Sequence, residues 1–190
     1  MDRDEVGKIL RQAAARARGY ADFFDGPDKS LKEWGIAQTF LEELQRNGGP
    51  KIRCGKQHPG GANHAPDFQI ISADGGIWGV EITELVSQKA IEATKRGEEV
   101  FADWSDAQLI AQFDAIIAKK DDSSNVKGGP YDRYVLLAHV DEPILTQERL
   151  ETALGGRTLR TRLIDELYVL MSYQPTNQCC PLLRFSTTKT

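Results

Sequence analysis

Residues 66–83, PDFQIISADGGIWGVEIT, decide how this chain is expected to fold. Within them, an apolar run over 68–71 leads into the tight-turn sequence DGG at 74–76, and a second apolar run follows over 77–82. Glycine supplies the backbone freedom that a short turn between strands requires, and aromatic and β-branched residues on both sides favour extended backbone. The stretch therefore predicts a β-hairpin.

Two carboxylates flank this hairpin. Asp67 begins the first strand and Glu81 lies near the end of the second, fourteen residues later. Side chains at positions i and i+2 of a strand share a face, so Glu81 and Thr83 point the same way, and strand pairing can bring Asp67 beside them. Neighbouring carboxylates repel each other unless a cation or a shared proton relieves them, and such hard oxygen ligands suit Mg²⁺ or Mn²⁺. The ordinary alternatives are a turn residue for Asp67 and a solvated edge-strand residue for Glu81.

The hydrophobic pattern on both sides of the hairpin predicts a mixed α/β chain. Apolar spacings of three and four predict helices, and short apolar runs predict strands, in this order: helices over 4–24 and 30–45, a strand over 52–56, the hairpin, a helix over 104–120, a strand over 134–140, a helix over 146–154 and a strand over 163–172. Residues 84–99 fit either a helix or a mobile loop, and the tail from Gln174 reads as irregular. This order is not a regular βαβ alternation, so a Rossmann-type fold is not expected.

Capping residues indicate where two of these helices begin. Ser30 followed by Glu33 three residues later fits a capping box, in which each side chain binds a backbone N–H at the helix start. Ser105 is the expected N-cap of the helix over 104–120.

The length and composition place the chain among globular proteins. Its 190 residues suffice for one domain with a single core, which we divide into a helical extension (1–29), a core (30–140) and a C-terminal helix and strand (141–190). Hydrophobic residues make up 40% and charged residues 27%, which excludes a disordered chain. There is no apolar run of membrane-spanning length, no signal-peptide core at the start, and only three cysteines. We therefore expect a protein of the reducing cytoplasm.

Charge is distributed unevenly along the chain. The net charge of −4 argues against non-specific binding of nucleic acid through bulk charge. Residues 1–60 carry a net +2, residues 61–122 a net −7 and residues 123–190 a net +1. An acidic centre between mildly basic flanks fits a metal site beside elements that contact a polyanion. A helix with a solvated acidic face would explain the same pattern.

The residues Pro66-Asp67 and Glu81-Ile82-Thr83 resemble the motif of the PD-(D/E)xK nuclease superfamily, with threonine in place of the lysine. The resemblance covers roughly residues 30–140 and implies a restriction-endonuclease-like α/β core, a mixed sheet with a central hairpin flanked by helices. In that superfamily the core runs helix, three strands, helix, strand, and a glutamate often stands on the first helix. Glu33 occupies that place in this chain.

The function implied by the resemblance is divalent-metal-dependent cleavage of phosphodiester bonds, in DNA more than in RNA, and a homodimer is compatible with it. By analogy, Asp67, Glu81 and the backbone carbonyl of Ile82 would hold Mg²⁺ or Mn²⁺, and Glu33 would join through water. The metal would activate a water molecule and stabilise the charge that builds on the phosphate.

Thr83 departs from the superfamily pattern, because a hydroxyl orients water but supplies no positive charge. In some members of the superfamily the missing group comes from the next helix. In this chain Gln108, Gln112 and Lys119 share one face of the helix over 104–120, so Lys119 or Gln112 is the expected replacement.

Two other functions compete with the nuclease. A catalytically inactive nuclease-like domain that binds nucleic acid or protein would fit the negative net charge and the absence of the motif lysine. A zinc hydrolase would use Cys54, His58 and His64, but no fourth ligand stands at a recognised spacing. No membrane partner is expected.

Overall fold

The computed structural model of the chain describes residues 20–24, 28–57, 66–122, 126 and 128–190. Most of the helix expected over 4–24 therefore lies outside the described residues. Among the helices of the described part, none is long and apolar enough to cross a membrane.

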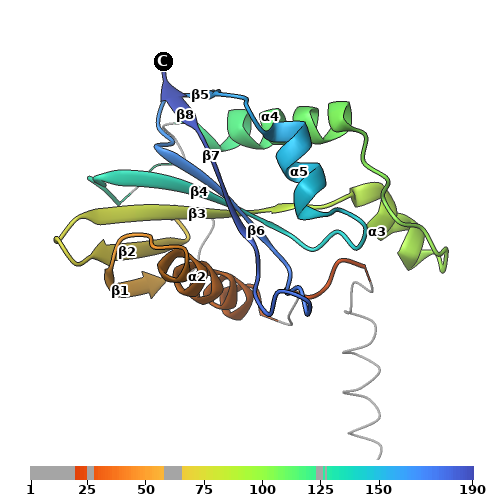
Figure 1. Cartoon of the computed structure of the whole chain (residues 1–190), viewed down its shortest axis with the longest axis horizontal. Helices are drawn as coiled ribbons and strands as arrows, with labels where there is room; N and C mark the ends of the chain where they lie inside the picture. Colours follow the sequence, from red (N-terminus) through yellow and green to blue (C-terminus); the bar gives the residue numbers. More distant parts are fainter. Residues whose placement is uncertain (1–19, 25–27, 58–65, 123–125, 127) are drawn as a thin grey trace, which may run out of the picture.

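A six-stranded mixed sheet forms the centre of the molecule (Figure 1). Its strands, in spatial order, are β1 (Ile52–Gln57), β2 (Phe68–Ser72), β3 (Ile77–Leu85), β4 (Arg133–Val140), β6 (Glu166–Met171) and β7 (Leu182–Phe185). Strands β1, β2 and β3 pair antiparallel, β3, β4 and β6 pair parallel, and β7 returns antiparallel to β6. The mixed α/β class and the central hairpin predicted from the sequence are confirmed.

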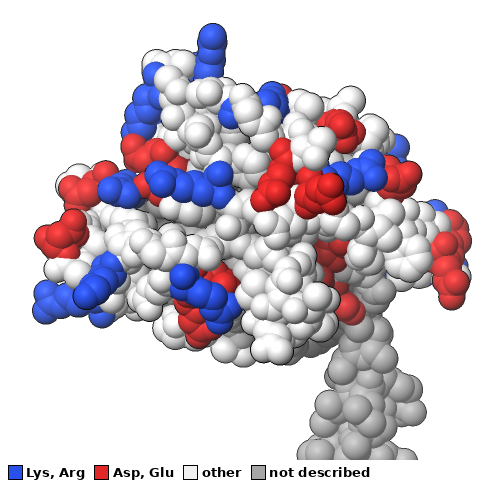
Figure 2. Space-filling view, viewed as in Figure 1, with Lys and Arg blue, Asp and Glu red and all other residues white. Residues whose placement is uncertain are grey.

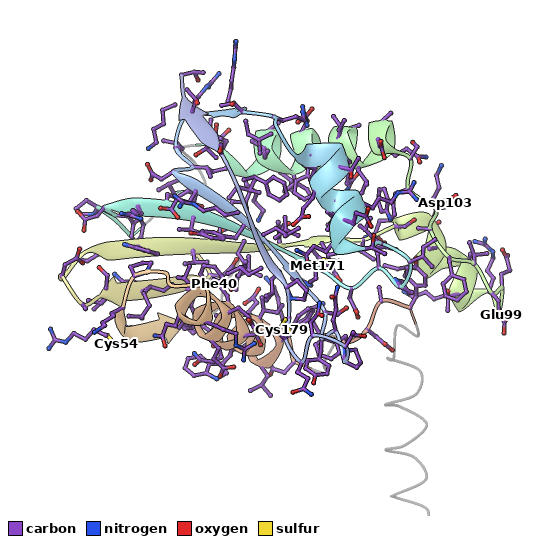
Figure 3. The ribbon with its side chains drawn as sticks, viewed as in Figure 1. Phe40, Cys54, Glu99, Asp103, Met171 and Cys179 are labelled. Carbon is purple, nitrogen blue, oxygen red and sulfur yellow. The ribbon has the colours of Figure 1, made fainter. Side chains whose placement is uncertain are left out.

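Helices cover both faces of this sheet and give the molecule three layers (Figure 1). Helix α2 (Lys29–Arg46) packs on one face, and α4 (Asp106–Lys120) and α5 (Gln147–Leu154) pack on the other. A shorter helix, α3 (Gln88–Lys95), connects β3 toward α4. Side chains fill the space on both sides of the sheet, with Phe40 in the layer under α2 and Met171 in the layer under α4 and α5 (Figure 3).

Alternation along β3 decides which of its side chains face which helix. Trp78, Val80 and Ile82 belong to the core under α2, whereas Leu85 belongs to the core under α4 and α5. Because successive side chains of a strand point to opposite faces, Glu81 lies on the α4 side of the sheet. This side holds the candidate site.

Helices α2 and α4 both begin at a residue whose side chain caps the helix, but the N-cap of α2 differs from the prediction. Helix α4 begins at Ser105 with a complete capping box formed with Gln108, as predicted. Helix α2 begins earlier than predicted, because Asp28 and not Ser30 is its N-cap and accepts the N–H of Ser30 at 2.7 Å. Glu33 therefore lies in the second turn and is not the partner of a capping box.

The C-terminal tail was expected to be irregular, and this expectation is wrong. It contains β7 at the sheet edge and β8 (Thr187–Lys189), which pairs with β5 (Leu159–Thr161) in a separate two-stranded sheet. These strands have three or four residues, and β5 and β8 are mostly polar, so no period-two pattern is long enough to be recognised. In the undecided segment 84–99 the chain forms α3.

Candidate active site

The hairpin places Asp67 and Glu81 at the same end. The register of β2 and β3 ends with the pair Phe68–Val80, and Asp67 and Glu81 are the next residues along the two chains. The Asp67 side chain binds the backbone of Ile82, and its carboxylate interacts electrostatically with that of Glu81. The structure thus brings together the two carboxylates on which the predicted metal site depends.

The regular pairing of β2 with β3 ends just after Asp67. Pro66 does not continue the register, because its ring packs against the backbone of Gly79. The N–H of Ile82 is bound instead by the Asp67 side chain, whose Oδ2 accepts it at 2.8 Å. The strand pairing therefore ends with a side-chain hydrogen bond from the Ile82 backbone to Asp67.

Glu81 is a buried carboxylate with only one of its oxygens paired. Its exposed fraction is 5%, its Oε1 accepts a hydrogen bond from Lys120 Nζ, and its Oε2 is buried without a hydrogen-bond partner among the described residues. Burial, reinforced by the Asp67 carboxylate, raises the pKa of Glu81, and the Lys120 ammonium partly opposes this shift. A second positive charge would be stabilising at this oxygen.

Lys120 reaches Glu81 because it ends the buried stripe of α4. The buried residues of this helix include Phe113 and Ile116, and Lys120 follows Ile116 by four residues, one turn along the same face. Lys119 is exposed, and the structure sets Lys120, not Lys119, against Glu81. Extending the buried stripe by one turn places Lys120 on the inner face of the helix, but its contact with Glu81 also depends on how the end of α4 is anchored.

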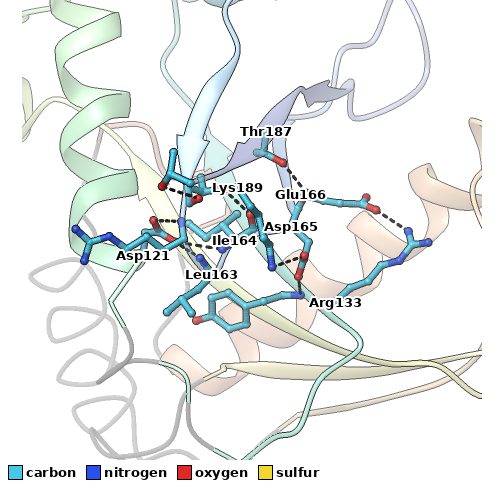
Figure 4. A network of polar contacts seen from close by, with 12 residues as sticks. Asp121, Arg133, Leu163, Ile164, Asp165, Glu166, Thr187 and Lys189 are labelled. Atoms are coloured by element: carbon cyan, nitrogen blue, oxygen red, sulfur yellow. Dashed lines mark hydrogen bonds and ion pairs between the residues drawn. The ribbon is translucent and has the colours of Figure 1, made fainter.

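Asp121 fixes the end of α4 that carries Lys120. It is the C-cap residue, and its carboxylate accepts three successive backbone N–H groups, from Arg162 at 2.6 Å, Leu163 at 2.7 Å and Ile164 at 3.1 Å (Figure 4). Such a carboxylate holds the helix terminus on the segment before β6. The lysine is therefore positioned by a rigid anchor.

Glu33 joins the same charged cluster from α2. Its side chain forms an ion pair with Lys29 at 3.2 Å, and its pKa is raised by burial and then by the Asp67 carboxylate. Glu33 thus lies within electrostatic range of Asp67.

Thr83 and Gln112 have different relations to the carboxylates. Thr83 is half-buried on the face of β3 that carries Glu81. Gln112 lines a hollow of about 560 Å³ between α3 and α4, together with Ser87 and Trp104. It lies eight residues before Lys120, about 12 Å along the helix axis, so the structure does not bring Gln112 to the carboxylates.

Tyr134 is a site residue that the sequence reasoning missed. It pairs with Gly79 in the parallel register of β3 and β4, is only 3% exposed, and its hydroxyl has no hydrogen-bond partner among the residues described. Burial and the Glu81 and Asp67 carboxylates raise its pKa, so it is a neutral phenol at physiological pH. Its position in an apolar strand makes it resemble an ordinary core tyrosine.

The oxygen atoms of this site are of the kind that bind a divalent cation, although they are few. Within the described ranges, no three His, Cys, Asp or Glu side chains are arranged to hold a metal ion. The Asp67 and Glu81 carboxylates nevertheless supply hard oxygen donors, and Oε2 of Glu81 has no hydrogen-bond partner among the described residues. Of the alternative zinc ligands, Cys54 is exposed, and His58 and His64 lie outside the described residues.

The raised pKa values predict that stability falls as the pH rises. Glu81 and Glu33 have folded-state pKa values above 4.5, so the folded state holds more protons than the unfolded state between that pH and the folded-state pKa. The contribution of these two groups to the free energy of unfolding is fully present below this pH window. It is lost as the pH rises through the window. Glu81→Gln should flatten this decline, as measured by urea unfolding at intervals from about pH 5 to about pH 8. An equally steep decline in Glu81→Gln would contradict the assignment to Glu81.

Two carboxylates, a lysine ammonium and a buried phenol can together bind a cation and an adjacent anion. This combination suits hydrolysis of a phosphate ester, since the chemistry needs a positioned water and compensation for negative charge. Comparisons with protein-family models, with curated proteins and with solved structures find no match for this chain.

Proposed function

We propose that this protein is a divalent-metal-dependent nuclease with a restriction-endonuclease-like core, acting on DNA. The observation that carries the proposal is the convergence of Asp67, Glu81 and Lys120 at one place. In this proposal they correspond to the two carboxylates and the lysine of the PD-(D/E)xK pattern, and Lys120 of α4 takes the place of the lysine that Thr83 replaces.

The order of the elements supports the same proposal. The chain runs through α2, the three strands β1, β2 and β3, then α4 and β4, which is the helix, three strands, helix, strand order of the superfamily. Helix α3 is an insertion before α4. Glu33 stands on the first of these helices, as the superfamily pattern expects.

Each residue has a defined task in this proposal. Asp67, Glu81 and the Ile82 carbonyl would hold Mg²⁺ or Mn²⁺, with Glu33 reaching it through water. When bound, the metal supplies a more acidic water molecule and neutralises charge on the phosphate. Lys120 contributes fixed positive charge next to the phosphate, and the Thr83 hydroxyl orients water on the same face of β3.

A metal-dependent increase in stability tests the site without an activity assay. At an Mn²⁺ concentration about a hundredfold above its Kd, binding to the folded state alone adds roughly 2.7 kcal/mol, which raises the melting temperature of a chain of this length by about 5–10 °C. The same titration of Glu81→Gln should give a much smaller increase. A wild-type melting temperature that does not respond to Mn²⁺ would count against the site.

The inactive binding domain is the second candidate, and one observation favours it. Lys120 already neutralises the charge of Glu81 within the chain. Such an internal ion pair would stabilise a domain that no longer binds a metal at this site. This candidate predicts binding of nucleic acid without cleavage in Mg²⁺ or Mn²⁺. Cleavage of single- and double-stranded DNA by the wild type, absent in EDTA, would exclude it.

A further inference from the structure

Helix α2 exposes an aromatic surface next to the candidate active site. Trp34 is 42% exposed, and Leu31, one turn earlier, is also largely exposed. The Trp34 ring lies 5.5 Å from the ring of Phe68. Because Trp34 follows Glu33 and Phe68 follows Asp67 in the chain, this surface borders the site without being part of its carboxylate cluster.

Basic residues lie beside this aromatic surface. Residues 29–34 and 51–57 carry five basic side chains and one acidic, in a chain whose net charge is −4. Hydrogen bonds between Ser30 and Gln57 join the start of α2 to the end of β1. The exposed side chains of Lys51, Arg53 and Lys56 follow β1, and basic groups gather over this strand in Figure 2.

The length of this basic row suits the backbone of a nucleic acid. Strand β1 is an edge strand of six residues, so it spans roughly 20 Å. Lys56 pairs with Gln69 and points away from the face of Phe68, so the cations lie on both faces of this edge strand and can contact several successive phosphates along it. The strand ends at Gln57, which pairs with Phe68, the residue whose ring Trp34 contacts. Single-stranded binding sites combine these two features, a basic groove for the backbone and an aromatic ring on which an unpaired base stacks.

We propose that Trp34 stacks on an unpaired base of single-stranded DNA whose phosphates bind Lys51, Arg53 and Lys56. The inference rests on the proposed function and assigns its substrate class. A duplex conceals the faces of its bases, so it cannot use Trp34. A protein partner is disfavoured because the apolar area consists of two side chains bordered by cations, whereas protein-binding patches are larger and continuous.

The test measures DNA binding without cleavage. Fluorescence anisotropy in EDTA, with a labelled oligonucleotide of about 15 nucleotides and the matching duplex, should give tighter binding of the single strand. Trp34→Leu keeps an apolar contact with Phe68 but removes the stacking ring, and it should weaken single-strand binding at least about fivefold. Trp34→Phe should weaken it less.

Two further variants serve as controls of position and charge. Tyr173 is 45% exposed and follows β6, which is separated from β2 by two strands, so Tyr173→Ala should leave binding unchanged. The double variant Arg53→Ala/Lys56→Ala should reduce the slope of log K against log salt by about 1.4, because each phosphate contact of a single strand contributes about 0.7.

Binding is measured in EDTA and cleavage in Mn²⁺, so the inference is tested separately from the proposed function. Trp34-dependent binding in EDTA supports the inference even if the wild type fails to cleave DNA in Mn²⁺, a result that would overturn only the nuclease. Any one of three results would overturn the inference. These are equal affinity for single strand and duplex, unchanged single-strand binding by a folded Trp34→Leu variant, and no binding of DNA by the wild type. A Trp34→Leu variant that changes the oligomeric state and not DNA affinity would assign the surface to a second copy of the chain.

Discussion

Asp67→Asn is expected to slow Mn²⁺-supported DNA cleavage by at least about a thousandfold, because the metal loses one of its two carboxylates and with it several kcal/mol of charge stabilisation. Asparagine retains an oxygen that accepts the N–H of Ile82, the contact that Asp67 makes at 2.8 Å. The backbone at the end of β2 should therefore keep its geometry. Initial cleavage rates of single- and double-stranded DNA provide the measurement.

The matched control for this substitution is Asp106→Asn. Asp106 is exposed in the first turn of α4, away from the hairpin, and the change from carboxylate to amide should leave the cleavage rate nearly unaltered. Cleavage that persists at the wild-type rate in purified Asp67→Asn would point to a contaminating nuclease or to a different site.

Lys120→Ala is expected to slow cleavage on the order of a hundredfold, the usual cost of removing one preorganised donor from a site that stabilises developing charge. Its neighbour Lys119 provides a close control, since it is exposed and the ion pair with Glu81 belongs to Lys120. Lys119→Ala should therefore cleave at nearly the wild-type rate. Rates are compared below the melting temperature of each variant, because Lys120→Ala also leaves Glu81 buried without its cation.

A rescue experiment distinguishes lost charge from lost structure. Thr83 lies on the same face of β3 as Glu81, so a lysine there can supply the ammonium from the strand instead of the helix. Thr83→Lys in the Lys120→Ala background should recover a large part of the rate. If Lys119→Ala is the slow variant and Lys120→Ala is not, the sequence-based choice of Lys119 holds and the role proposed for Lys120 fails.

The parts of the fold that were predictable have strong local signals. The hairpin follows from two apolar runs around a glycine-rich turn, and α4 follows from its capping serine and buried stripe. The presence of Asp67 and Glu81 at the same end of the hairpin follows from the same turn, because the register fixes which residues stand at that end.

The remaining parts depend on contacts between distant segments. The position of Lys120 depends on how far the buried face of α4 extends and on the anchoring of Asp121 by residues 162–164, which are some forty positions away in the sequence. Tyr134 has the pattern of a core residue. It is distinguished by a hydroxyl that has no hydrogen-bond partner in the described part of the chain and by the electrostatic influence of Glu81 on its pKa. The short strands β5 and β8 exist because they pair with each other, and neither carries a pattern of its own.

The proposed divalent-metal site consists of Asp67, Glu81 and the Ile82 carbonyl, beside Lys120. Anomalous diffraction from crystals grown with Mn²⁺ locates the ion without assumptions about activity. A single strong peak is expected between the Asp67 and Glu81 carboxylates, with metal–oxygen distances of about 2.0–2.2 Å. Crystals saturated with Mn²⁺ that show no peak there, with Lys120 still bound to Glu81, would contradict it.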